Sequence, residues 1–391
     1  MSQWDVIIIG AGAAGLMCAI EAGKRGRKTL VLDHTNKAGK KILMSGGGRC
    51  NFTNYDVSAS NYLSDNPHFC KSALSRFNQW DFLALVNKYN IPFHERDHGQ
   101  LFCDNSAKDI LNMLLDQCQQ YDVCIQLNST IKKITRIEQA YPFQIKCDTD
   151  DYQSSSLVIA TGGLSIPKMS ASPFGYKIAD QFGIPVTPTR AGLVPFTWHQ
   201  QDKQQYEPLS GIAVPAVVSL DQTHFSENVL FTHRGLSGPA ILQISSFWQA
   251  GQTIKINWLP EQDLQQLFES FTPQTRVKNI LYKHLPKRMV DTLWPDTMLD
   301  QPLQHWRQQQ ISDFTQKVHQ WQLKPNGTEG YRTAEVTVGG VECNAISSRT
   351  MESKQVAGLY FIGEVLDVTG WLGGYNFQWA WSSGWVAGQN V

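Results

Sequence analysis

The chain has 391 residues, enough for two or three domains with substantial hydrophobic cores. Its 34 basic and 34 acidic residues balance, which excludes the overall charge typical of proteins dedicated to nucleic acids or anionic membranes. Its longest apolar run is too short to cross a bilayer, and no basic segment precedes an apolar stretch as in a signal peptide.

Eight cysteines are scattered along the chain, without a Cys-x-x-Cys pair or a Cys/His group at zinc spacing. In a chain of this length the pattern favours reduced thiols. We therefore expect a cytoplasmic protein with neither structural disulfides nor a metal site.

The amino-terminal segment has the pattern of a dinucleotide-binding turn. A β-branched run at 5–9 predicts a buried parallel strand, and 16–24 predicts a helix. Between them, Gly10 allows a tight turn, Gly12 a close approach to a pyrophosphate, and Gly15 close packing of helix on strand. The phosphates are then expected at the helix N-terminus, where the dipole favours negative charge.

A second predicted strand supports this interpretation. Residues 28–32 follow the helix and end at Asp33, which places a carboxylate about twenty residues beyond the glycines. Such an acid accepts from ribose hydroxyls and repels a 2′-phosphate. The alternative is a βαβ unit without a ligand.

The next segment is rich in glycine. Gly46, Gly47 and Gly48 are consecutive, and three glycines do not form a stable helix or strand interior. Hydrogen-bonding residues flank them, including Ser45 and Arg49. We interpret the segment as backbone beside a flavin ring and its diphosphate, with a flexible surface loop as the alternative.

Further elements are predicted up to residue 163. The span 69–89 predicts one core-packed helix, and a capping-box pattern at Ser106 opens another that ends at Tyr121. Short alternating stretches predict a β-meander at 123–127, 131–137 and 143–147. Residues 156–159 then predict a strand that returns beside the pyrophosphate and ends at Thr161 and Gly162.

From residue 190 the pattern changes, and we expect an inserted domain at 190–330 between two parts of a nucleotide domain, 1–189 and 331–391. Its β part, about 190–258, contains predicted strands at 193–196, 214–220, 228–232 and 254–258 and a helix at 239–247. Its Gln-rich part, about 259–325, is expected to be helical. Such an insertion is expected to cap the flavin face and to select the substrate.

The carboxy-terminal segment predicts a strand from 358 that ends at Gly363 and Glu364. A glycine-rich loop and a helix over 377–386 follow. The N-terminus of that helix is expected to face the pyrimidine side of a flavin, where it would stabilise negative charge on the reduced ring.

Longer motifs resemble a known family. They are Gly39-Lys40-Lys41-Ile42-Leu43-x-Ser45-Gly46-Gly47-Gly48-Arg49-Cys50-Asn51-x-Thr53-Asn54, Phe231-Thr232-His233-x-Gly235-Leu236-Ser237-Gly238-Pro239, Gly363-Glu364-x-Leu366-Asp367 and Gly373-Gly374-Tyr375-Asn376. With the amino-terminal glycines, they resemble the bacterial BaiN/YhiN-type FAD-dependent oxidoreductases, a group that includes aminoacetone oxidases. Asp33 stands where this family usually has Glu, and Ser172 to Gly175 lacks the usual glycine richness.

The resemblance implies an α/β fold: a two-dinucleotide-binding-type, Rossmann-like FAD domain with an inserted β plus helical domain. The residues expected to bind FAD are Gly10, Gly12, Ala13, Ala14, Gly15, Asp33, Lys41, Ser45, Gly46, Gly47, Gly48, Arg49, Cys50, Asn51, Thr161, Gly162, Gly363, Glu364, Gly373, Gly374, Tyr375, Asn376 and Phe377.

Catalytic candidates follow from the chemistry of C=C reduction, in which an acid protonates the carbon beside the one that receives hydride. Cys50 is the first candidate, followed by Tyr375 and His233, while Arg49 and Arg234 could polarise a substrate carbonyl. A thiol packed against the flavin ring and a loop-fixing histidine are the alternatives. Cys50 lacks a cysteine four or five residues away, which argues against a dithiol reductase.

An electron donor for the flavin and a substrate are expected as well. No second glycine fingerprint occurs, so NAD(P)H would bind transiently without a nucleotide fold of its own. Members of the group are associated with amine oxidation, with reduction of conjugated steroid double bonds, and with reduction of uridine to dihydrouridine in ribosomal RNA.

We expect NAD(P)H-dependent C=C reduction, and more narrowly ribosomal RNA uridine. The narrower expectation rests on the resemblance and on a run without acids at 276–290, whose cations are Arg276, Lys278, Lys283, His284, Lys287 and Arg288. A solvated helix face is the other meaning of such a run. A small-molecule flavin oxidase for amines or aminoketones, a conjugated-enone reductase and a non-enzymatic flavin-binding sensor stay open.

Overall fold

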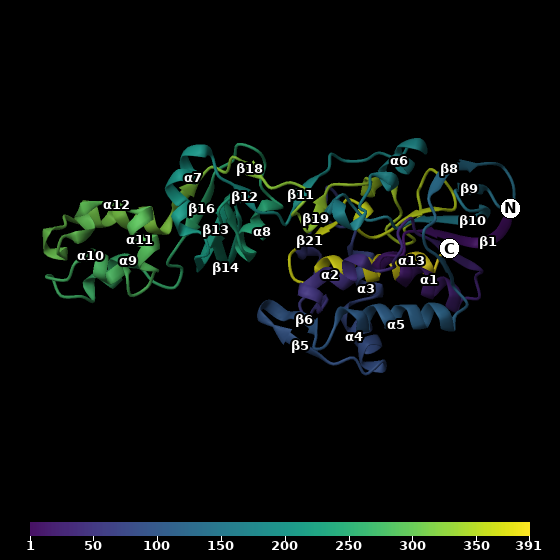
Figure 1. The fold of residues 1–391 in the computed structure, drawn as a ribbon, viewed down its shortest axis with the longest axis horizontal. Coiled ribbons are helices and arrows are strands. Elements are labelled where there is room, and N and C mark those ends of the chain that lie inside the picture. The colour runs from purple at the N-terminus through teal and green to yellow at the C-terminus, as the bar shows by residue number, and fades with distance from the viewer. The chain divides into compact units, whose positions relative to one another are not determined.

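The computed structural model describes all residues from Met1 to Val391. They form two compact units: unit 1 comprises Met1–Arg190 and Val336–Val391, and unit 2 comprises Ala191–Glu335 (Figure 1). None of the helices combines the length and the apolar composition needed to cross a lipid bilayer. The role of the insertion as a cap over a flavin stays a prediction.

Unit 1 contains most of the strands. They are β1 (Ser2–Ile9), β2 (Thr29–Leu32), β3 (Asn51–Asn54), β4 (Tyr62–Leu63), β5 (Phe93–Arg96), β6 (Gln100–Cys103), β7 (Cys124–Gln126), β8 (Ile131–Arg136), β9 (Phe143–Cys147), β10 (Asp151–Ile159), β19 (Val336–Val338), β20 (Leu359–Phe361) and β21 (Thr369–Gly370); β11 spans Arg190–Gly192. Its helices are α1 (Ala13–Lys24), α2 (Lys40–Gly48), α3 (Lys71–Arg76), α4 (Gln79–Lys88), α5 (Ala107–Gln120), α6 (Phe174–Gln181) and α13 (Tyr375–Gly388).

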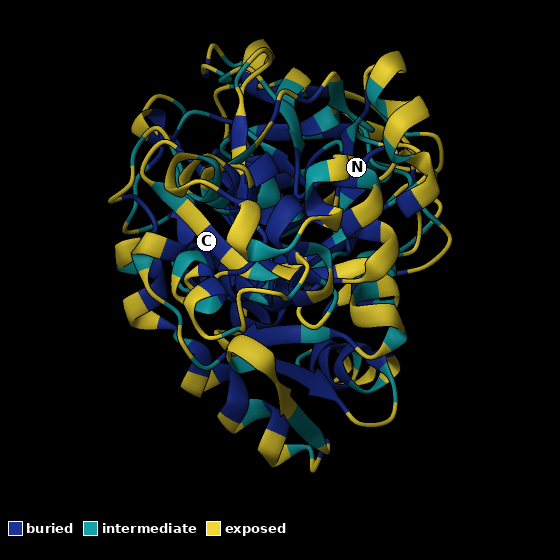
Figure 2. Ribbon diagram, turned by 90° about the vertical axis from the view of Figure 1, so that its left-hand side faces the viewer, coloured by how far each residue is buried: buried dark blue, intermediate teal, exposed yellow.

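The main sheet of unit 1 has the order β7-β2-β1-β10-β9-β8, and β20 also pairs with β10. Strands β7, β2, β1, β10 and β20 are parallel neighbours, so their carboxyl ends meet at one edge. The side chains of Val6, Ile7 and Ile8 have no exposed area, as expected of a parallel strand covered on both faces. Figure 2 shows such buried stretches on interior ribbons and exposed ones on outer turns.

Three predictions for unit 1 need correction. The strand at Cys124–Gln126 pairs in parallel with β2 and extends the nucleotide sheet, so only β8, β9 and β10 form the antiparallel meander. The single helix expected at 69–89 is two helices, because Asn78 accepts from the amides of Trp80 and Asp81 and starts α4 anew. At Ser106 the expected capping box does not form: the Ser106 side chain accepts from the amide of Lys108, as a simple N-cap, and not from that of Asp109.

Helices α1 and α13 approach each other at backbone distance. A Cβ placed on Gly384 would lie 2.5 Å from the carbonyl oxygen of Ala14, and one on Gly388 would lie 2.5 Å from Cβ of Glu21. Because glycine permits this contact, the amino-terminal turn and the carboxy-terminal helix are held together.

Unit 2 consists of a five-stranded antiparallel sheet and a group of short helices. Its strands are β12 (Phe196–Thr197), β13 (Ala213–Leu220), β14 (Thr223–Phe231), β15 (Leu236–Ser237), β16 (Ile254–Asn257), β17 (Trp321–Leu323) and β18 (Gly327–Thr328), with the sheet order β15-β14-β13-β16-β17. Its helices are α7 (Gln200–Tyr206), α8 (Pro239–Ser245), α9 (Leu264–Glu269), α10 (Val277–Leu281), α11 (Lys287–Leu293) and α12 (Gln308–His319). The strand expected at 193–196 is absent except for its last residue, which begins β12.

The core of the sheet in unit 2 is a closed circuit of aromatic rings. Neighbouring rings have centroids 5.3 to 6.3 Å apart. The five members are Trp198, Tyr206, Trp321, Trp258 and Phe231. Such pairs contribute about 0.5–1.5 kcal/mol each beyond their buried area, and the circuit joins β17 to the rest of the sheet.

His319 ties the two parts of unit 2 together in its neutral form. Its Nδ1 lies 2.8 Å from Oδ1 of Asn257, and its Nε2 accepts from the amide of Leu264 at 3.2 Å. Because a backbone amide can only donate, the ring proton is on Nδ1. Burial lowers the pKa of His319, opposed by the nearby charge of Asp263.

This arrangement predicts a pH-dependent stability of unit 2. Since the folded state lowers the pKa of His319, the unfolded state binds more protons, and stability present above about pH 6.5 is lost as pH falls through the folded pKa. Thermal unfolding measured from pH 7.5 to pH 5 should show this loss, and His319→Gln should reduce it. His305→Gln, at an exposed position, is the control and should leave the slope unchanged. An unaltered slope in His319→Gln would contradict the assignment.

Candidate flavin-binding site

The glycine turn between β1 and α1 has the three roles expected from its spacing. A Cβ on Gly10 would lie 2.4 Å from the carbonyl oxygen of Ala160, and one on Gly15 would lie 1.9 Å from that of Gly10. Both positions therefore pack backbone against backbone. A Cβ on Gly12 would meet no atom within 4 Å, so the space beside this residue is open.

The start of α1 has the character of an anion site. Gly12 precedes the first helical residue, Ala13, and the first turn contains no acidic side chain. The first amides of a helix lack intrahelical acceptors, and Gly12 has no side chain to supply one. The open space beside Gly12 thus adjoins donors suited to a phosphate.

Asp33 lies beside the same turn. Its Oδ2 accepts from the amide of Ala11 and its Oδ1 from that of Thr35, both at 2.8 Å. The carboxylate is therefore fixed at the carboxyl end of β2, next to the glycines. Each oxygen retains a lone pair, which leaves acceptor capacity for a hydroxyl group.

The triple-glycine segment interrupts α2 as expected. Ser45 is extended, and Gly46 and Gly47 have φ values of +57° and +66°, in the left-handed region. Phe102 of β6 packs so close to Gly46 that an added Cβ would lie 2.8 Å from its ring. The turn is therefore anchored on one side, while Gly46, Gly47 and Arg49 are exposed on the other.

Cys50 ends this turn with its side chain in the core. The residue has no exposed area and a φ of +48°. Burial raises the pKa of the Cys50 thiol well above its usual value, although a hydrogen bond with Ser45 opposes the shift. The thiol is therefore protonated at neutral pH, in the environment of a packing residue.

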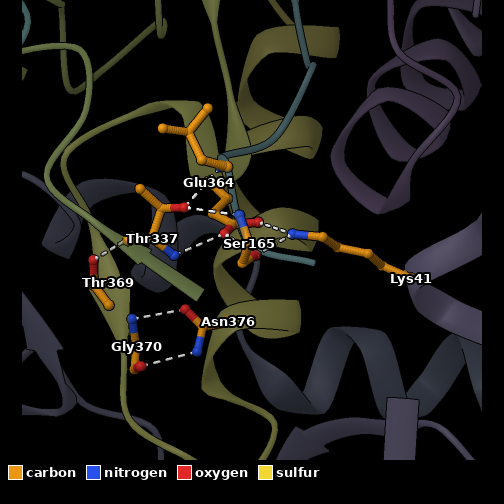
Figure 3. Close-up of polar contacts among 8 residues, drawn as sticks. Lys41, Ser165, Thr337, Glu364, Thr369, Gly370 and Asn376 are labelled. Carbon is orange, nitrogen blue, oxygen red and sulfur yellow. Dashed lines mark hydrogen bonds and ion pairs between the residues drawn. The ribbon is translucent and has the colours of Figure 1, made fainter. Parts of the chain in front are cut away.

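Glu364 joins segments that are far apart in the sequence (Figure 3). Its Oε2 lies 2.7 Å from Nζ of Lys41, and its Oε1 accepts from Oγ of Ser165 at 3.1 Å and from the amide of Thr337 at 3.0 Å. The Lys41 ammonium also donates to Ser165 at 2.7 Å. The carboxylate is thus occupied by protein donors, whereas Lys41 retains one of its three N–H groups for a ligand.

Ser165 and Thr337 were not among the residues predicted for the site. Oγ1 of Thr337 accepts from the amides of Leu164 and Ser165, which fixes the loop that follows β10. A single hydroxyl residue in a loop or a short strand carries no spacing signal. Only the position of Thr337 immediately before Val338-Gly339-Gly340 could have drawn attention to it.

The Gly373–Gly374 loop leads into α13 and packs on β3. Gly374 has a φ of +95°, and a Cβ there would lie 2.3 Å from the carbonyl oxygen of Thr53. The side chain of Asn376 closes the loop with two hydrogen bonds to Gly370 (Figure 3). Its Oδ1 accepts from the backbone amide of Gly370 at 2.8 Å, and its Nδ2 donates to the carbonyl of Gly370 at 2.9 Å. The side-chain amide of Asn51 lies 3.2 Å from the backbone N–H of Gly374. The triple-glycine segment and the carboxy-terminal loop therefore meet.

One polar atom at the end of β10 lacks a partner. Oγ1 of Thr161 is buried without a hydrogen bond and lies against Gly175 of α6, while the backbone nitrogen of Thr161 lies beside Gly10. The groups suited to a dinucleotide are instead the amides beside the open space at Gly12, the Asp33 carboxylate and the remaining donor of Lys41. The residues present therefore fit FAD.

His233 and Arg234 belong to unit 2, in the turn between β14 and β15. Arg234 is exposed and forms an ion pair with Glu329 at 3.3 Å, and His233 lies in the same turn. Both remain predictions as catalytic residues, and so do Arg49, Cys50 and Tyr375 in unit 1.

The cationic run at 276–290 needs one correction, because folding brings acids to it from outside. Lys278 lies 2.9 Å from Asp291 and 3.8 Å from Asp300, and the bond to Asp291 raises its pKa above the usual value. Lys278 is therefore already paired. Arg276, Lys283, His284, Lys287 and Arg288 are exposed, and Arg288 donates to the carbonyl of Ser210.

Comparison with known proteins decides the family. Residues 4–390 match the family described as HI0933-like protein Rossmann domain. The chain belongs to this family. It is a FAD-dependent oxidoreductase, as predicted, and the predicted fold class is confirmed by the parallel sheet and the family match.

Three known proteins are similar to the chain over nearly their whole length. The ribosomal RNA dihydrouridine synthase of Escherichia coli K12 is 54% identical over 400 residues, covering 100% of this chain and 98% of that protein. The protein of the same name from Haemophilus influenzae is 49% identical, covering 100% and 99%. The 3-dehydro-bile acid delta(4,6)-reductase of Clostridium scindens is 28% identical, covering 98% and 97%.

Solved structures share the fold at low identity. The 3-ketosteroid-delta4-(5alpha)-dehydrogenase of Rhodococcus jostii RHA1 has a TM-score of 0.51 at 12% identity, covering 99% of this chain and 97% of that one. A quinol-fumarate reductase has a TM-score of 0.50 at 14% identity, covering 99% and 70%. At these identities the likeness concerns the fold alone.

The contrast between Gly12 and Gly15 gives a test of the site. Gly15→Ala should lower the stability of the protein by about 1–3 kcal/mol, because its Cβ has no room beside Gly10. Gly12→Ala should fold normally but lose FAD, since its Cβ would occupy the open space at the helix start. Thermal unfolding of the flavin-free variants and FAD titration separate the two effects. Unchanged FAD affinity in Gly12→Ala would contradict the placement of the pyrophosphate.

Proposed function

We propose that this chain reduces uridine to dihydrouridine in ribosomal RNA, with NAD(P)H as the electron donor. The observation that carries the proposal is the 54% and 49% identity, over essentially the whole chain, to two proteins named ribosomal RNA dihydrouridine synthase. Because both alignments cover the whole chain, this identity extends over unit 1 and unit 2. The donor is proposed from the chemistry, because reduction of a C=C bond consumes a hydride and a proton.

The residues of unit 1 would hold FAD through the elements described above. The helix start at Gly12 to Ala14 would bind the pyrophosphate, Asp33 the adenosine ribose, and Lys41 an anionic or carbonyl oxygen. FAD, when bound, supplies hydride-transfer chemistry. The exposed triple-glycine backbone offers amides without side chains that would obstruct a planar ring.

The overall reaction saturates the C5=C6 bond of the uracil ring. In a conjugated enone, hydride adds to the carbon distant from the carbonyl, here C6, and a proton adds to C5, while NAD(P)H becomes NAD(P)⁺. A cation near the C4 carbonyl would stabilise the charge that develops there. We propose Arg49 for this role, with Arg234 of unit 2 as the second candidate, because both guanidinium groups are exposed.

The proton donor is proposed among Cys50, Tyr375 and His233. Cys50 has no exposed area, which favours its alternative role in packing. Tyr375, the first residue of α13 after the glycine loop, is 7% exposed, and its ring packs edge-on against Tyr62 and Trp371. We therefore rank Tyr375 before Cys50.

The exposed cations of 276–290 are proposed to contact RNA phosphates. Lys283 and Lys287 lie over the rings of Phe271 and Tyr282 at 4.6 and 5.6 Å, which holds their ammonium groups at the surface. Arg276 is exposed beside them in sequence. Neutralised phosphates release counterions, so this contact would weaken as salt rises.

A second candidate function is reduction of a conjugated small-molecule enone. The 28% identity to a protein named 3-dehydro-bile acid delta(4,6)-reductase favours it. The two functions share the C=C chemistry and differ in the substrate.

The direct experiment compares dihydrouridine in ribosomal RNA from parent and deletion cells by mass spectrometry. We expect a loss on deletion that is restored by the intact gene and not by Gly12→Ala. Anaerobic bleaching of the bound flavin by NADH or NADPH tests the donor. Unchanged dihydrouridine in the deletion cells would refute the RNA proposal, and turnover of an enone would then support the second candidate.

The proton-donor ranking predicts different losses in two variants. Tyr375→Phe should reduce the rate of C=C reduction by about 10²–10⁴-fold, the usual contribution of general acid catalysis, without slowing flavin reduction by the donor. Cys50→Ala should retain most of the activity but lower stability, since it leaves a cavity. Stopped-flow measurement of the two half-reactions distinguishes these effects. The reverse pattern would restore Cys50 as the donor.

The ion pairs of unit 2 predict a graded effect of charge removal. Lys283→Gln and Lys287→Gln should each weaken RNA binding. Each should also reduce the slope of log affinity against log salt concentration by about one, because one phosphate contact is lost. Lys278→Gln is the matched control on the same run and should change binding less, because its charge is already paired with Asp291. Equal effects at Lys278 and Lys283 would contradict the patch.

A further inference from the structure

Unit 1 has a local excess of positive charge that extends beyond the residues proposed to hold FAD. Two segments carry it, 34–55 and 152–179, and neither contains an aspartate or a glutamate. Acidic and basic residues balance in the whole chain, so this segregation is a property of these two segments. Their lysine and arginine residues are Lys37, Lys40, Lys41, Arg49, Lys168 and Lys177.

Folding joins the two segments through lysine–serine hydrogen bonds. Nζ of Lys41 donates to Oγ of Ser165 at 2.7 Å, and Nζ of Lys40 donates to Oγ of Ser170 at 3.3 Å. The charge of Lys41 is balanced by Glu364, which lies at the centre of the polar cluster (Figure 3). Lys40, in contrast, has no carboxylate within ion-pair distance. Its positive charge is therefore uncompensated on the structure.

The pair formed by Lys40 and Ser170 offers donors but no second acceptor nearby. The ammonium group of Lys40 uses one of its three N–H groups on Ser170. Because the Ser170 oxygen accepts this bond, its own O–H is left to donate to a ligand. Lys168 lies two residues earlier, in the same turn, and is exposed. Two ammonium groups and a hydroxyl donor thus come from one small region, which suits an anion.

The turn that carries Lys168 and Ser170 is held in an unusual backbone conformation. Ile166 has a φ of +55° and Ser170 a φ of +70°, both in the left-handed region. That region is unfavourable for a β-branched residue such as isoleucine, and such conformations persist where the surrounding structure imposes them, most often at functional sites. Here the start of the turn is fixed, because the amide of Ser165 donates to Oγ1 of Thr337 at 3.2 Å. The donors are therefore positioned before any ligand binds.

We propose that Lys40, Lys168 and Ser170 form a phosphate-binding site on unit 1, distinct from the pyrophosphate site at Gly12, for a molecule that reacts with the flavin. Lysine binds phosphate groups as a point charge, and a hydroxyl adds a directed hydrogen bond. The inference rests on the proposed function for the two sources of this phosphate, the RNA backbone and NAD(P)H. Both carry phosphate groups, and both must reach the flavin.

The first arm of the test measures binding of fluorescently labelled hexauridylate to the full-length, FAD-loaded protein at several salt concentrations. If the phosphate belongs to RNA, Lys40→Gln and Lys168→Gln should each weaken binding about three- to tenfold. Each should also reduce the slope of log affinity against log salt concentration by about 0.7, the value for one phosphate contact on a single strand. Lys24→Gln is the matched control and should change binding less than twofold, because Lys24 of unit 1 is already paired with Glu21 at 2.6 Å.

The second arm measures the apparent Kd of NADPH and of NADH from the rate of anaerobic flavin reduction by stopped flow. If the phosphate belongs to the donor, the same two variants should raise this Kd about three- to tenfold, as for the loss of one charged hydrogen bond, and leave hexauridylate binding unchanged. A larger loss for NADPH than for NADH identifies the 2′-phosphate, and equal losses identify the pyrophosphate. Lys40→Arg keeps the charge and should retain most of the affinity in either arm.

Three results would overturn the proposal. The first is wild-type affinity of Lys40→Gln and Lys168→Gln in both arms, and the second is an equal loss in Lys24→Gln. The third concerns FAD, whose titration into the flavin-free variants should give an unchanged Kd at an unchanged melting temperature. A loss of FAD affinity as large as the loss in either arm would assign these lysines to the FAD diphosphate instead.

The failure of this inference is distinguishable from that of the proposed function. If deletion removes dihydrouridine from ribosomal RNA but the lysine variants behave as wild type in both arms, only the phosphate-site proposal fails. If dihydrouridine persists in deletion cells while Lys40→Gln and Lys168→Gln still weaken binding of hexauridylate or of NAD(P)H, the phosphate-site proposal stands and the substrate proposal fails.

Discussion

The site depends on one packing constraint: backbone must touch backbone around the amino-terminal turn without filling the space at its centre. Gly10 and Gly15 meet carbonyl oxygens at distances that no Cβ tolerates, whereas Gly12 borders open space. Gly384 brings α13 onto α1 in the same way. The helix start therefore presents its amides at the carboxyl edge of a parallel sheet, where ligands of such folds bind.

A polar cluster holds the rest of the site to this turn. Glu364 receives hydrogen bonds from Lys41, Ser165 and Thr337, three segments separated by long stretches of sequence. Loss of the carboxylate would leave several donors unpaired, each at a cost of about 1–3 kcal/mol where it is buried. The cluster thus defines the position of Lys41, the cation with remaining capacity for a ligand.

The sequence was most informative where chemistry requires a particular backbone. The glycine spacing, the acid at the end of β2 and the triple glycine each predicted a local geometry that the structure contains, because few residues other than glycine adopt those conformations. It was least informative about long-range pairing. Ser165, Thr337 and the pairing of Lys278 with Asp291 depend on tertiary contacts. The helix break at Asn78 is different, because its cap with Asp81 is local and the continuous apolar stripe obscured it.

Hydrogen exchange of backbone amides with and without FAD tests the central claim most directly. The account predicts that FAD slows exchange together at three segments, 11–15, 46–50 and 373–376, which are distant in sequence but belong to one site. Protection confined to one of these segments, or its absence from 11–15, would contradict it.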